Sequence, residues 1–574
     1  MRKIFSILKS NYKFKLLLVI VFSIITLILE TLSIALIYPI VKSLIDKDYF
    51  KLFFERIIVF EEVNDHYYIF FMMFILVLVF LLKNISIFIL GLLQNRYVNL
   101  VSRELSSKFY SFYIKSDYLD FISRNTSVYI RNILDNISNF FSGYFRSIIV
   151  IINETLIILF VIFILILAQP ISALFFILLF TSAGFLIYIF NRKKIRNLGI
   201  DIQGHLTNRL QYLNQGFGSF KDIKLLSVEN FFLNQFSKQT KSVLNISYKV
   251  DAILSYPRLV LEFLGLLSIV ALISYNLILG KMLKDIAPLI ALFSLAGIRL
   301  LPSASRIISS LQRLRYSSSV KLILEKEIDK FFILNANKKD LPNTINTLDN
   351  FKKLTLKNVS FSYPENKKNI LENINLDISK GEFIVIVGKS GSGKTTLINI
   401  LLGLIKVSKG YVKANNKNIN DNIRDWHALI GHVPQDVYLL DDTLRANIAV
   451  GVSVNDIDLK RLRKSIIQSQ LDKFTKLSLD DQKNFIGEKG IKISGGQRQR
   501  IGIARALYKD PEILIFDEAT SALDKTTERS LLLDIKKLNK NKTIIMITHR
   551  ESVLEFCSKA FIIENKKIRI LKIK

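Results

Sequence analysis

The 574 residues of this chain are enough for two to four domains, and 50% of them are hydrophobic. Cys557 is the single cysteine, which excludes an intrachain disulfide framework and a cysteine-cluster zinc site. The formal net charge of +31 does not indicate a nucleic-acid partner, because the lysines and arginines are spread along the chain and gather beside apolar stretches, as in membrane proteins.

The composition of the chain changes near residue 318. Before this point, long stretches of Ile, Leu, Phe and Val alternate with segments rich in Lys and Arg, whereas the remainder has the composition of a soluble α/β protein. We therefore predict a multi-domain chain, with an all-α transmembrane domain over residues 1–318, a linker over 319–350 and an α/β domain over 351–574.

The first domain contains apolar stretches long enough to cross a membrane, which takes roughly 20 residues of helix. The first stretch follows a basic N-terminus and superficially resembles a secretory signal, but its apolar run is too long for one and has no small-residue cleavage site. We interpret it as the first of six transmembrane helices. The predicted helices lie at about residues 16–45, 67–94, 144–168, 170–191, 252–279 and 285–308.

Two long segments, about residues 95–143 and 192–251, separate these helices on one side of the membrane. Both are rich in Lys and Arg, as is the N-terminus, so the positive-inside bias places them in the cytoplasm. Six spans then return the chain to the cytoplasm before the second domain. Apolar residues keep helical spacing through both segments except around residues 117–125 and 216–222, which predicts membrane helices prolonged into the cytoplasm around short turns.

The first external connection, residues 46–66, carries aromatic and aliphatic side chains along one helical stripe and charges elsewhere. This pattern is typical of an amphipathic helix that lies in the membrane interface. A helix that packs on its neighbours would show the same pattern, and the sequence does not separate the two interpretations.

Ionisable residues inside membrane helices are costly and indicate function by default. Arg299 and Arg306 are seven residues apart, which places them on one helix face two turns from each other. A guanidinium group can donate two hydrogen bonds to a phosphate, so a cavity that binds an anionic headgroup is one hypothesis. The alternative is that arginines pair with Glu262 or Glu30 to hold helices together. The candidate substrate residues are Lys83, Arg258, Arg299 and Arg306.

The second domain contains a phosphate-binding loop. An apolar run at 384–387 leads into GKSGSGKTT, so that a strand, a glycine-rich loop and a helix follow one another. Glycines let backbone N–H groups approach the phosphates, Lys394 reaches the β and γ oxygens, and the Thr395 hydroxyl holds magnesium. The residues expected to bind nucleotide here are Gly388, Ser390, Gly391, Ser392, Gly393, Lys394, Thr395 and Thr396.

Asp517 and Glu518 end the apolar run of ILIFDEAT. Asp517 is suited to orienting the magnesium shell and Glu518 to polarising the attacking water. Two adjacent acids after a strand could also be solvated charges, but their distance from the phosphate loop and the SALD tetrapeptide that follows them favour the catalytic interpretation.

The residues ISGGQRQR at 493–500 resemble the signature of the ABC transporter ATPase. The resemblance covers essentially the whole chain, because exporters of this family also have six membrane helices before the ATPase. It assigns HVPQD to the glutamine loop, ITHR to the switch histidine, and the aromatic residue of SFSYP to stacking on adenine. The residues so matched are the signature Ser494, Gly495, Gly496 and Gln497, the D-loop 521–524, and Gln435, His549 and Tyr363.

The family resemblance implies a head-to-tail dimer, in which ATP lies between the phosphate loop of one subunit and the signature of the other. Glu518, His549 and Gln435 would then be catalytic, and Thr395, Gln435 and Asp517 would hold Mg²⁺. Because this chain has one membrane domain and one ATPase domain, we expect a homodimer. Its two sites would both be competent, since Glu518 and His549 are both present. The sequence GEKG at 487–490 resembles the loop that contacts the cytoplasmic ends of the membrane helices.

The segments YPRLVLEFLG and GIRLLPSASRI resemble exporters that flip lipid-linked oligosaccharides in bacterial protein glycosylation. This resemblance implies a polyprenyl-pyrophosphate oligosaccharide, or a similar anionic glycolipid, as the cargo at the bacterial cytoplasmic membrane. An exporter of lipid A, a peptide or a drug would share every ATPase motif and is the alternative.

Overall fold

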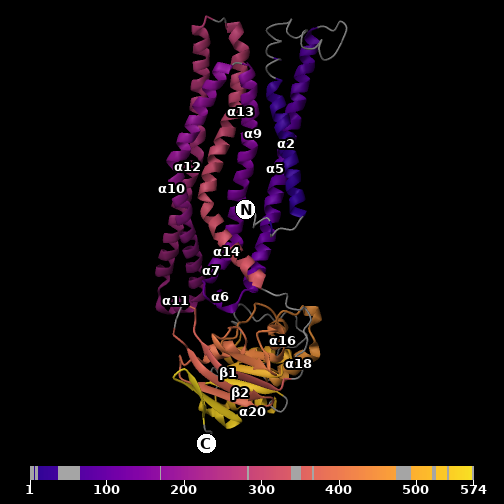
Figure 1. Ribbon diagram of the computed structural model, residues 1–574, viewed down its shortest axis with the longest axis vertical. Coiled ribbons are helices and arrows are strands. Elements are labelled where there is room, and N and C mark those ends of the chain that lie inside the picture. The colour runs from indigo at the N-terminus through magenta and orange to yellow at the C-terminus, as the bar shows by residue number, and fades with distance from the viewer. Residues whose placement is uncertain are drawn as a thin grey trace. The chain divides into compact units, whose positions relative to one another are not determined.

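The computed structural model describes residues 6, 11–36, 40, 65–168, 170–280, 283–337, 351–364, 368–472, 493–519, 525–538 and 542–571. The chain divides into two compact units. The first comprises Met1–Ser116 and Ser123–Asn337, and the second comprises Asp117–Ile122 and Lys338–Lys574. Figure 1 shows the first unit as long helices and the second as strands with shorter helices around them.

Six helices in the described part of the first unit are long and apolar enough to cross a membrane, as the sequence predicts. Three of them, with 49 or 50 residues each, are about 75 Å long at 1.5 Å per residue, which is more than twice the thickness of a bilayer core. They therefore extend well beyond the membrane. The six helices are α2 (Asn11–Ala35), α5 (Asp65–Ile114), α9 (Arg146–Ala168), α10 (Pro170–Gly218), α12 (Glu229–Ile278) and α13 (Leu283–Tyr316).

Short helices interrupt the long ones where the sequence predicts turns. Asn125 caps the first short helix after such a break, because its side chain accepts a hydrogen bond from the backbone N–H of Ser127. The second break ends at Ser227, whose φ of 54° lies in the left-handed region. The remaining elements of this unit are α7 (Thr126–Arg131), η1 (Asn132–Asn136), α8 (Ile137–Asn139), η2 (Phe140–Phe145), α11 (Phe220–Leu226) and α14 (Ser318–Asn337).

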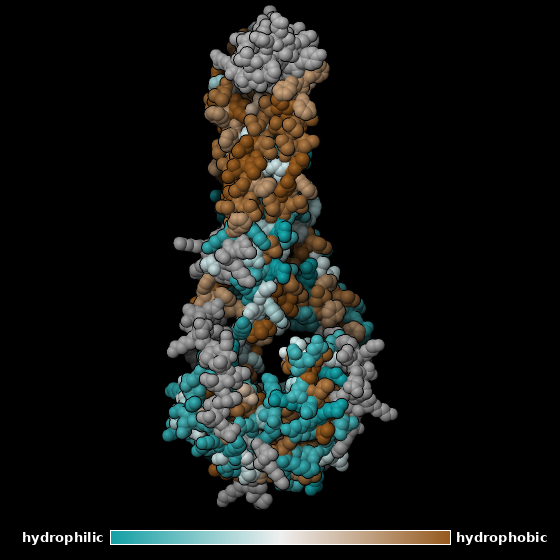
Figure 2. All heavy atoms as spheres, turned by 90° about the vertical axis from the view of Figure 1, so that its right-hand side faces the viewer, coloured by the Kyte–Doolittle hydropathy of each residue, from teal (hydrophilic) through white to brown (hydrophobic). Residues whose placement is uncertain are grey.

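Large apolar side chains lie on the surface of this unit, as expected for helices that are surrounded by lipid and not by water. Phe88, Phe190 and Ile278 are 67%, 78% and 84% exposed. Figure 2 shows a face of the long helices that is covered by apolar residues. An exposed apolar surface of this size indicates contact with a membrane. Residues 46–64, which make up most of the expected external amphipathic segment, lie outside the described residues.

The second unit is built on two sheets, which confirms the predicted α/β class. The first has the strand order β2-β1-β4-β5 and is antiparallel, and the second has the order β10-β9-β3-β8-β7-β6. The strands are β1 (Lys353–Phe361), β2 (Leu371–Ser379), β3 (Phe383–Gly388), β4 (Lys409–Ala414), β5 (Lys417–Asn418), β6 (Ile430–Val433), β7 (Ile513–Asp517), β8 (Thr543–Thr548), β9 (Lys559–Glu564) and β10 (Lys567–Leu571).

Strands β3, β6, β7 and β8 are parallel, so their carboxyl ends meet at one edge of the second sheet. Strands β3, β7 and β8 are mostly apolar along their length, which is typical of a parallel sheet whose two faces are both buried. The helices of this unit are α6 (Tyr118–Ile122), α15 (Lys394–Leu401), α16 (Ile423–Leu429), α17 (Leu444–Ile448), α18 (Leu459–Gln468), α19 (Gly495–Tyr508) and α20 (Lys525–Leu538), with the short η3 (Val454–Asp456) and η5 (Glu551–Phe556). Leu119 of α6 packs against the core of this unit.

Candidate functional site

The loop between β3 and α15 disfavours side chains at its glycines, either because there is no space or because the backbone φ is positive. A Cβ atom at Gly388 would lie 2.6 Å from the Ser392 hydroxyl and 3.0 Å from the carbonyl oxygen of Ile563. Gly391 and Gly393 have φ values of +79° and +101°, which favour glycine. The sequence GKSGSGKTT therefore forms the compact loop that the phosphate-binding motif predicts.

Lys394 begins α15 and turns its side chain back over this loop. Its ammonium group donates hydrogen bonds to the carbonyl oxygens of Gly388, at 2.7 Å, and Lys389, at 3.0 Å. The Ser392 hydroxyl is buried and has no hydrogen-bond partner among the described residues. A buried hydroxyl without a partner beside a lysine and a helix N-terminus fits a phosphate oxygen. Thr395 is exposed on the first turn of α15, whereas Thr396 is buried.

Glu518 lies at the centre of a group of side chains from three strand ends. Its carboxylate accepts a hydrogen bond from Gln435 Nε2 at 3.1 Å and lies 3.7 Å from His549 Nδ1. Lys394 Nζ is 3.9 Å away on the other carboxylate oxygen. The backbone of Glu518 has a φ of +46°, and its N–H donates to the carbonyl oxygen of Ile547 at 2.8 Å. The predicted catalytic residues therefore meet around one carboxylate.

Asp517 is the neighbouring acid at the end of β7. Its pKa is raised to about 6, first by burial and second by the charge of Glu518, while the Lys394 ammonium opposes both effects. A cation bound at this carboxylate would offset the free-energy cost of burying its negative charge. The donors predicted for Mg²⁺, on Thr395, Gln435 and Asp517, are all oxygens, which this ion prefers. No cluster of three or more His, Cys, Asp or Glu capable of holding a metal occurs within the described ranges, so phosphate oxygens would have to complete the magnesium shell.

The turn that carries His549 is held by a residue that sequence reasoning missed. Glu528 of α20 is 3% exposed and forms an ion pair with Arg550 at 2.9 Å. Ser552, three residues after His549, donates a hydrogen bond to the same carboxylate at 3.3 Å. The contact depends on how α20 packs against β8, and no spacing in the sequence indicates it.

Ser494 and Gln497 form a capping box at the start of α19. The Ser494 hydroxyl accepts from the Gln497 backbone N–H at 3.3 Å, and the Gln497 side chain accepts from the Ser494 backbone N–H at 2.9 Å. Ser494 and Gly495 are exposed, and Gly496 is half-buried. This part of the signature is therefore available to a second molecule. The expected D-loop, 521–524, and the sequence GEKG at 487–490 lie outside the described residues.

Tyr363, the residue expected to stack on adenine, is half-buried. Its ring meets the Phe361 ring edge to face at 5.1 Å and packs against the core of the unit. The remaining surface of the ring is available for stacking.

Four intramembrane charges of the first unit form a paired network. Arg299 is paired with Glu30 and lies 3.9 Å from Glu154, and Arg306 is paired with Glu154 at 2.6 Å. These four side chains line a cavity of about 650 Å³ among α2, α5, α9 and α13. The two arginines predicted to share a face therefore do meet one cavity, each with a carboxylate partner.

The other two candidate substrate residues are placed differently. Lys83 lies close enough to Glu30 and Arg299 for electrostatic interaction, and its ammonium group is 4.2 Å from the centre of the Phe80 ring. Arg258 is paired with Glu262 on its own helix at 2.7 Å, and its side chain is 73% exposed. Arg258 is not among the residues that line the 650 Å³ cavity.

Comparison with known proteins identifies the fold of both units. Residues 371–521 match the family described as ABC transporter. An ATP-dependent lipid A-core flippase of Cupriavidus pinatubonensis is 30% identical over 388 residues, which are 67% of this chain and 64% of that protein. A protein with the same name from Idiomarina loihiensis is 39% identical over 211 residues, which are 37% of this chain and 36% of that protein. The first of these matches spans slightly less than two thirds of the length of the curated relative, and the second spans about a third of it.

A solved structure has the same arrangement of elements. The structure of a bacterial Atm1-family ABC exporter with ATP bound matches with a TM-score of 0.76, covering 96% of this chain and 94% of that chain at 19% identity. At this identity the likeness shows the fold alone. This fold, the six apolar helices and the match to the ABC transporter family together indicate a multi-pass membrane protein that carries a nucleotide-binding domain.

Proposed function

From an ATPase domain of the ABC transporter family that follows six membrane-spanning helices, we infer that this chain is one half of an ATP-driven lipid exporter. The observation that carries the proposal is the placement of Gln435, His549 and Lys394 around the Glu518 carboxylate. This arrangement contains a general base, two groups that orient it and a cation for phosphate. A structural or purely binding role would not need all four.

The residues of this site have separate tasks in the proposed hydrolysis. Lys394 and the backbone N–H groups of its loop bind the phosphates of ATP, and Glu518 accepts a proton from the attacking water. Gln435 and His549 hold Glu518 in position. Mg²⁺, bound by Thr395, Gln435 and Asp517, would neutralise the charge that develops on the phosphate oxygens.

We further propose that two copies of the chain form the working transporter. Ser494 and Gly495 are exposed at the N-terminus of α19, where backbone N–H groups can donate to a phosphate. In a head-to-tail dimer this surface closes over the phosphate loop of the other copy. ATP binding would then bring the two ATPase domains together, and hydrolysis would release them.

The proposed cargo is an anionic glycolipid of the lipid A type. The support for this class comes from the relatives named lipid A-core flippases and from the cavity that contains Arg299 and Arg306. The polyprenyl-pyrophosphate oligosaccharide expected from the sequence has similar anionic chemistry but no support from these relatives. It therefore becomes the second candidate.

The proposed place of work is the bacterial cytoplasmic membrane, with the ATPase domain in the cytoplasm. The basic segments that join the membrane helices support this orientation through the positive-inside bias. Exposed cations in these segments include Arg192, Lys193, Lys194 and Arg196.

The cargo can be tested by ATP hydrolysis of the purified protein in liposomes. Lipid A-core, a polyprenyl-pyrophosphate glycolipid and a neutral glycolipid are added separately. We expect lipid A-core to stimulate hydrolysis, Arg306→Ala to remove the stimulation, and Arg258→Ala to keep it, because Arg258 is a paired intramembrane arginine that does not line the cavity. Stimulation by the polyprenyl lipid alone would favour the second candidate, and stimulation by neither would reject an anionic glycolipid cargo.

A further inference from the structure

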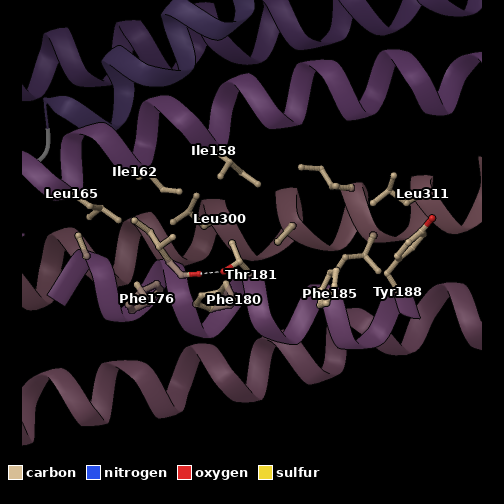
Figure 3. Close-up of a pocket in the computed structure, with 16 residues that line it drawn as sticks. Ile158, Ile162, Leu165, Phe176, Phe180, Thr181, Phe185, Tyr188, Leu300 and Leu311 are labelled. Carbon is tan, nitrogen blue, oxygen red and sulfur yellow. Dashed lines mark hydrogen bonds between the residues drawn. The ribbon is translucent and has the colours of Figure 1, made fainter. Parts of the chain in front are cut away.

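A second cavity, of about 390 Å³, lies among α9, α10 and α13. Figure 3 shows Ile158, Ile162 and Leu165 of α9 on one side of it and Phe176, Phe180 and Phe185 of α10 on the other. The side chains from α13 include Leu300 and Leu311. All of its lining residues except Leu311 fall within the predicted membrane spans 144–168, 170–191 and 285–308, so the cavity lies in the membrane part of the unit.

This cavity is separate from the one that contains the ion pairs. None of its 16 lining residues lines the other cavity. On α13, Arg299 and Arg306 face the ion-pair cavity, whereas Leu300, Ala304 and Leu311 line the second one. A ligand here would therefore be distinct from a cargo headgroup held by the arginines.

The lining selects an apolar ligand, because its polar atoms are few and mostly satisfied. Among the residues that line it, hydroxyl groups occur only on Thr181 and Tyr188. The Thr181 hydroxyl donates within its own helix, to the carbonyl oxygen of Ile177 at 2.7 Å. A polar ligand would lose its hydration in such a site without gaining partners. A hydrocarbon chain has no polar groups whose hydration would be lost.

One end of the cavity is positively charged. Figure 3 shows Tyr188 and Leu311 at this end and Leu165 and Phe176 at the other. The Tyr188 hydroxyl accepts a hydrogen bond from Arg315 Nε at 3.0 Å. Arg315 is exposed, and so is Arg192, which follows Tyr188 by one helical turn and lies on the same face of α10. Two guanidinium groups at the mouth of an apolar cavity suit a phosphate headgroup.

We propose that this cavity binds a hydrocarbon chain of an anionic phospholipid from the surrounding bilayer, with the phosphate of that lipid at Arg315 and Arg192. The bilayer has direct access, because Leu178 and Phe185 of the same helix are 70% and 64% exposed. The bound lipid fills the space between α10 and the α9–α13 pair. It is a resident lipid, not the exported cargo.

The test measures phospholipid that stays bound to the full-length protein. The protein is purified in detergent, incubated with phosphatidylglycerol or zwitterionic phosphatidylcholine, and examined by native mass spectrometry. The wild type is expected to retain one phosphatidylglycerol per chain in preference to phosphatidylcholine. Arg315→Ala should weaken retention about fivefold, which corresponds to roughly 1 kcal/mol for one cation near a lipid phosphate.

Thr181→Trp tests the chain-binding part, because Thr181 lines the cavity and a tryptophan there would occupy part of the space that the hydrocarbon chain needs. Ser182→Trp is the matched control, since Ser182 is exposed on the same helix, as Thr181 is, but does not line the cavity. We expect Thr181→Trp to lose the bound lipid and Ser182→Trp to keep it, with both variants still binding ATP. The proposal is overturned if the wild type retains no lipid, if both tryptophan variants behave alike, or if Arg315→Ala changes nothing. None of these results depends on whether the protein exports a lipid.

Discussion

Gln435 donates a hydrogen bond from Nε2 to Glu518 at 3.1 Å, across 83 residues of sequence. Gln435 follows β6 and Glu518 follows β7, and these strands are parallel neighbours. The contact joins a residue expected to hold Mg²⁺ to the residue expected to activate water.

Glu518→Gln should abolish hydrolysis while ATP still binds. The amide keeps the shape of the carboxylate but cannot accept the proton of the attacking water, and loss of a general base lowers kcat by about 10²- to 10⁴-fold. ATPase rates and nucleotide binding are measured on the same preparation. Glu551→Gln, an exposed acid near His549, is the control and should keep the wild-type rate. A Glu518→Gln variant that hydrolyses ATP at the wild-type rate would reject Glu518 as the base.

Gln435→Ala should lower kcat and raise the magnesium concentration that half-maximal hydrolysis requires. The substitution removes both the hydrogen bond to Glu518 and one expected oxygen ligand of the ion. A magnesium titration of the ATPase rate measures the effect. Asp436→Asn, one residue further along and also exposed, should leave the titration unchanged. If the two variants have the same titration, Gln435 has no role at the metal.

The raised pKa of Asp517 predicts that magnesium-dependent nucleotide binding changes with pH. Its folded-state pKa is raised to about 6, so the carboxylate is protonated below that pH and cannot hold the ion. Binding of ATP with Mg²⁺ should therefore weaken as the pH falls through about 6. Asp517→Asn should bind weakly at every pH and lose this dependence. Binding by the wild type that is unchanged between pH 5 and about 8 would contradict the prediction.

The same raised pKa makes the charged Asp517 a cost to the fold. Since the folded pKa lies above the unfolded value, the penalty is present above about pH 6 and disappears below the unfolded pKa. Asp517→Asn should therefore stabilise the nucleotide-free protein at pH near 7.5, by about 1 kcal/mol after allowance for solvent screening. Thermal unfolding without nucleotide measures this. A destabilised variant would show that the carboxylate has another favourable partner.

Arg299 should be more important for stability than Arg306. Glu30 and Arg299 have side chains that are 4% and 20% exposed, whereas the Arg306 side chain is 45% exposed. Removing one partner of a buried pair leaves an uncompensated charge, so Arg299→Ala should cost about 3–5 kcal/mol. The double variant Arg299→Met with Glu30→Gln should recover most of this loss in a thermal unfolding series. No recovery would mean that the pair does not couple the two helices.

The proposed dimer can be tested by mixing two inactive variants. Lys394→Ala disables a phosphate loop and Ser494→Arg disables a signature, but a mixed dimer of these chains keeps one intact site. Activity should return to about a quarter of the wild-type rate, because half of randomly formed dimers are mixed and each has one intact site of two. Mixtures that stay inactive, with a mixed dimer shown by affinity tags, would reject the head-to-tail arrangement.

The ATP site could be predicted from sequence because its residues follow the ends of strands. Glycine spacing identifies the loop after β3, and Asp517 and Glu518 end an apolar run that has the length of a buried strand. The six membrane helices could be predicted because apolar runs of about 20 residues are typical of membrane spans. Their prolongation could be predicted because helical spacing continues up to the breaks after Ile114 and Gly218, where α5 and α10 end.

The pairing of intramembrane charges could only partly be predicted. The structure contains a pair between Arg299 and Glu30 and another between Arg258 and Glu262, the two acids expected as partners. Glu154, which bridges both cavity arginines, was not expected as a partner, because the rotation of α9 against α13 decides that contact. The second cavity could not be predicted from the sequence, because a helix face that lines an apolar cavity and a helix face that contacts lipid are equally apolar.

The most direct test of the central claim is transbilayer movement of a fluorescent lipid A-core analogue in liposomes that contain the purified protein. The fraction of the analogue accessible to a membrane-impermeant quencher is followed after ATP is added outside. We predict that wild-type protein changes this fraction only with ATP and Mg²⁺, and that Glu518→Gln does not change it. Movement that is equal in the wild type and the variant, or movement without ATP, would contradict ATP-driven lipid export.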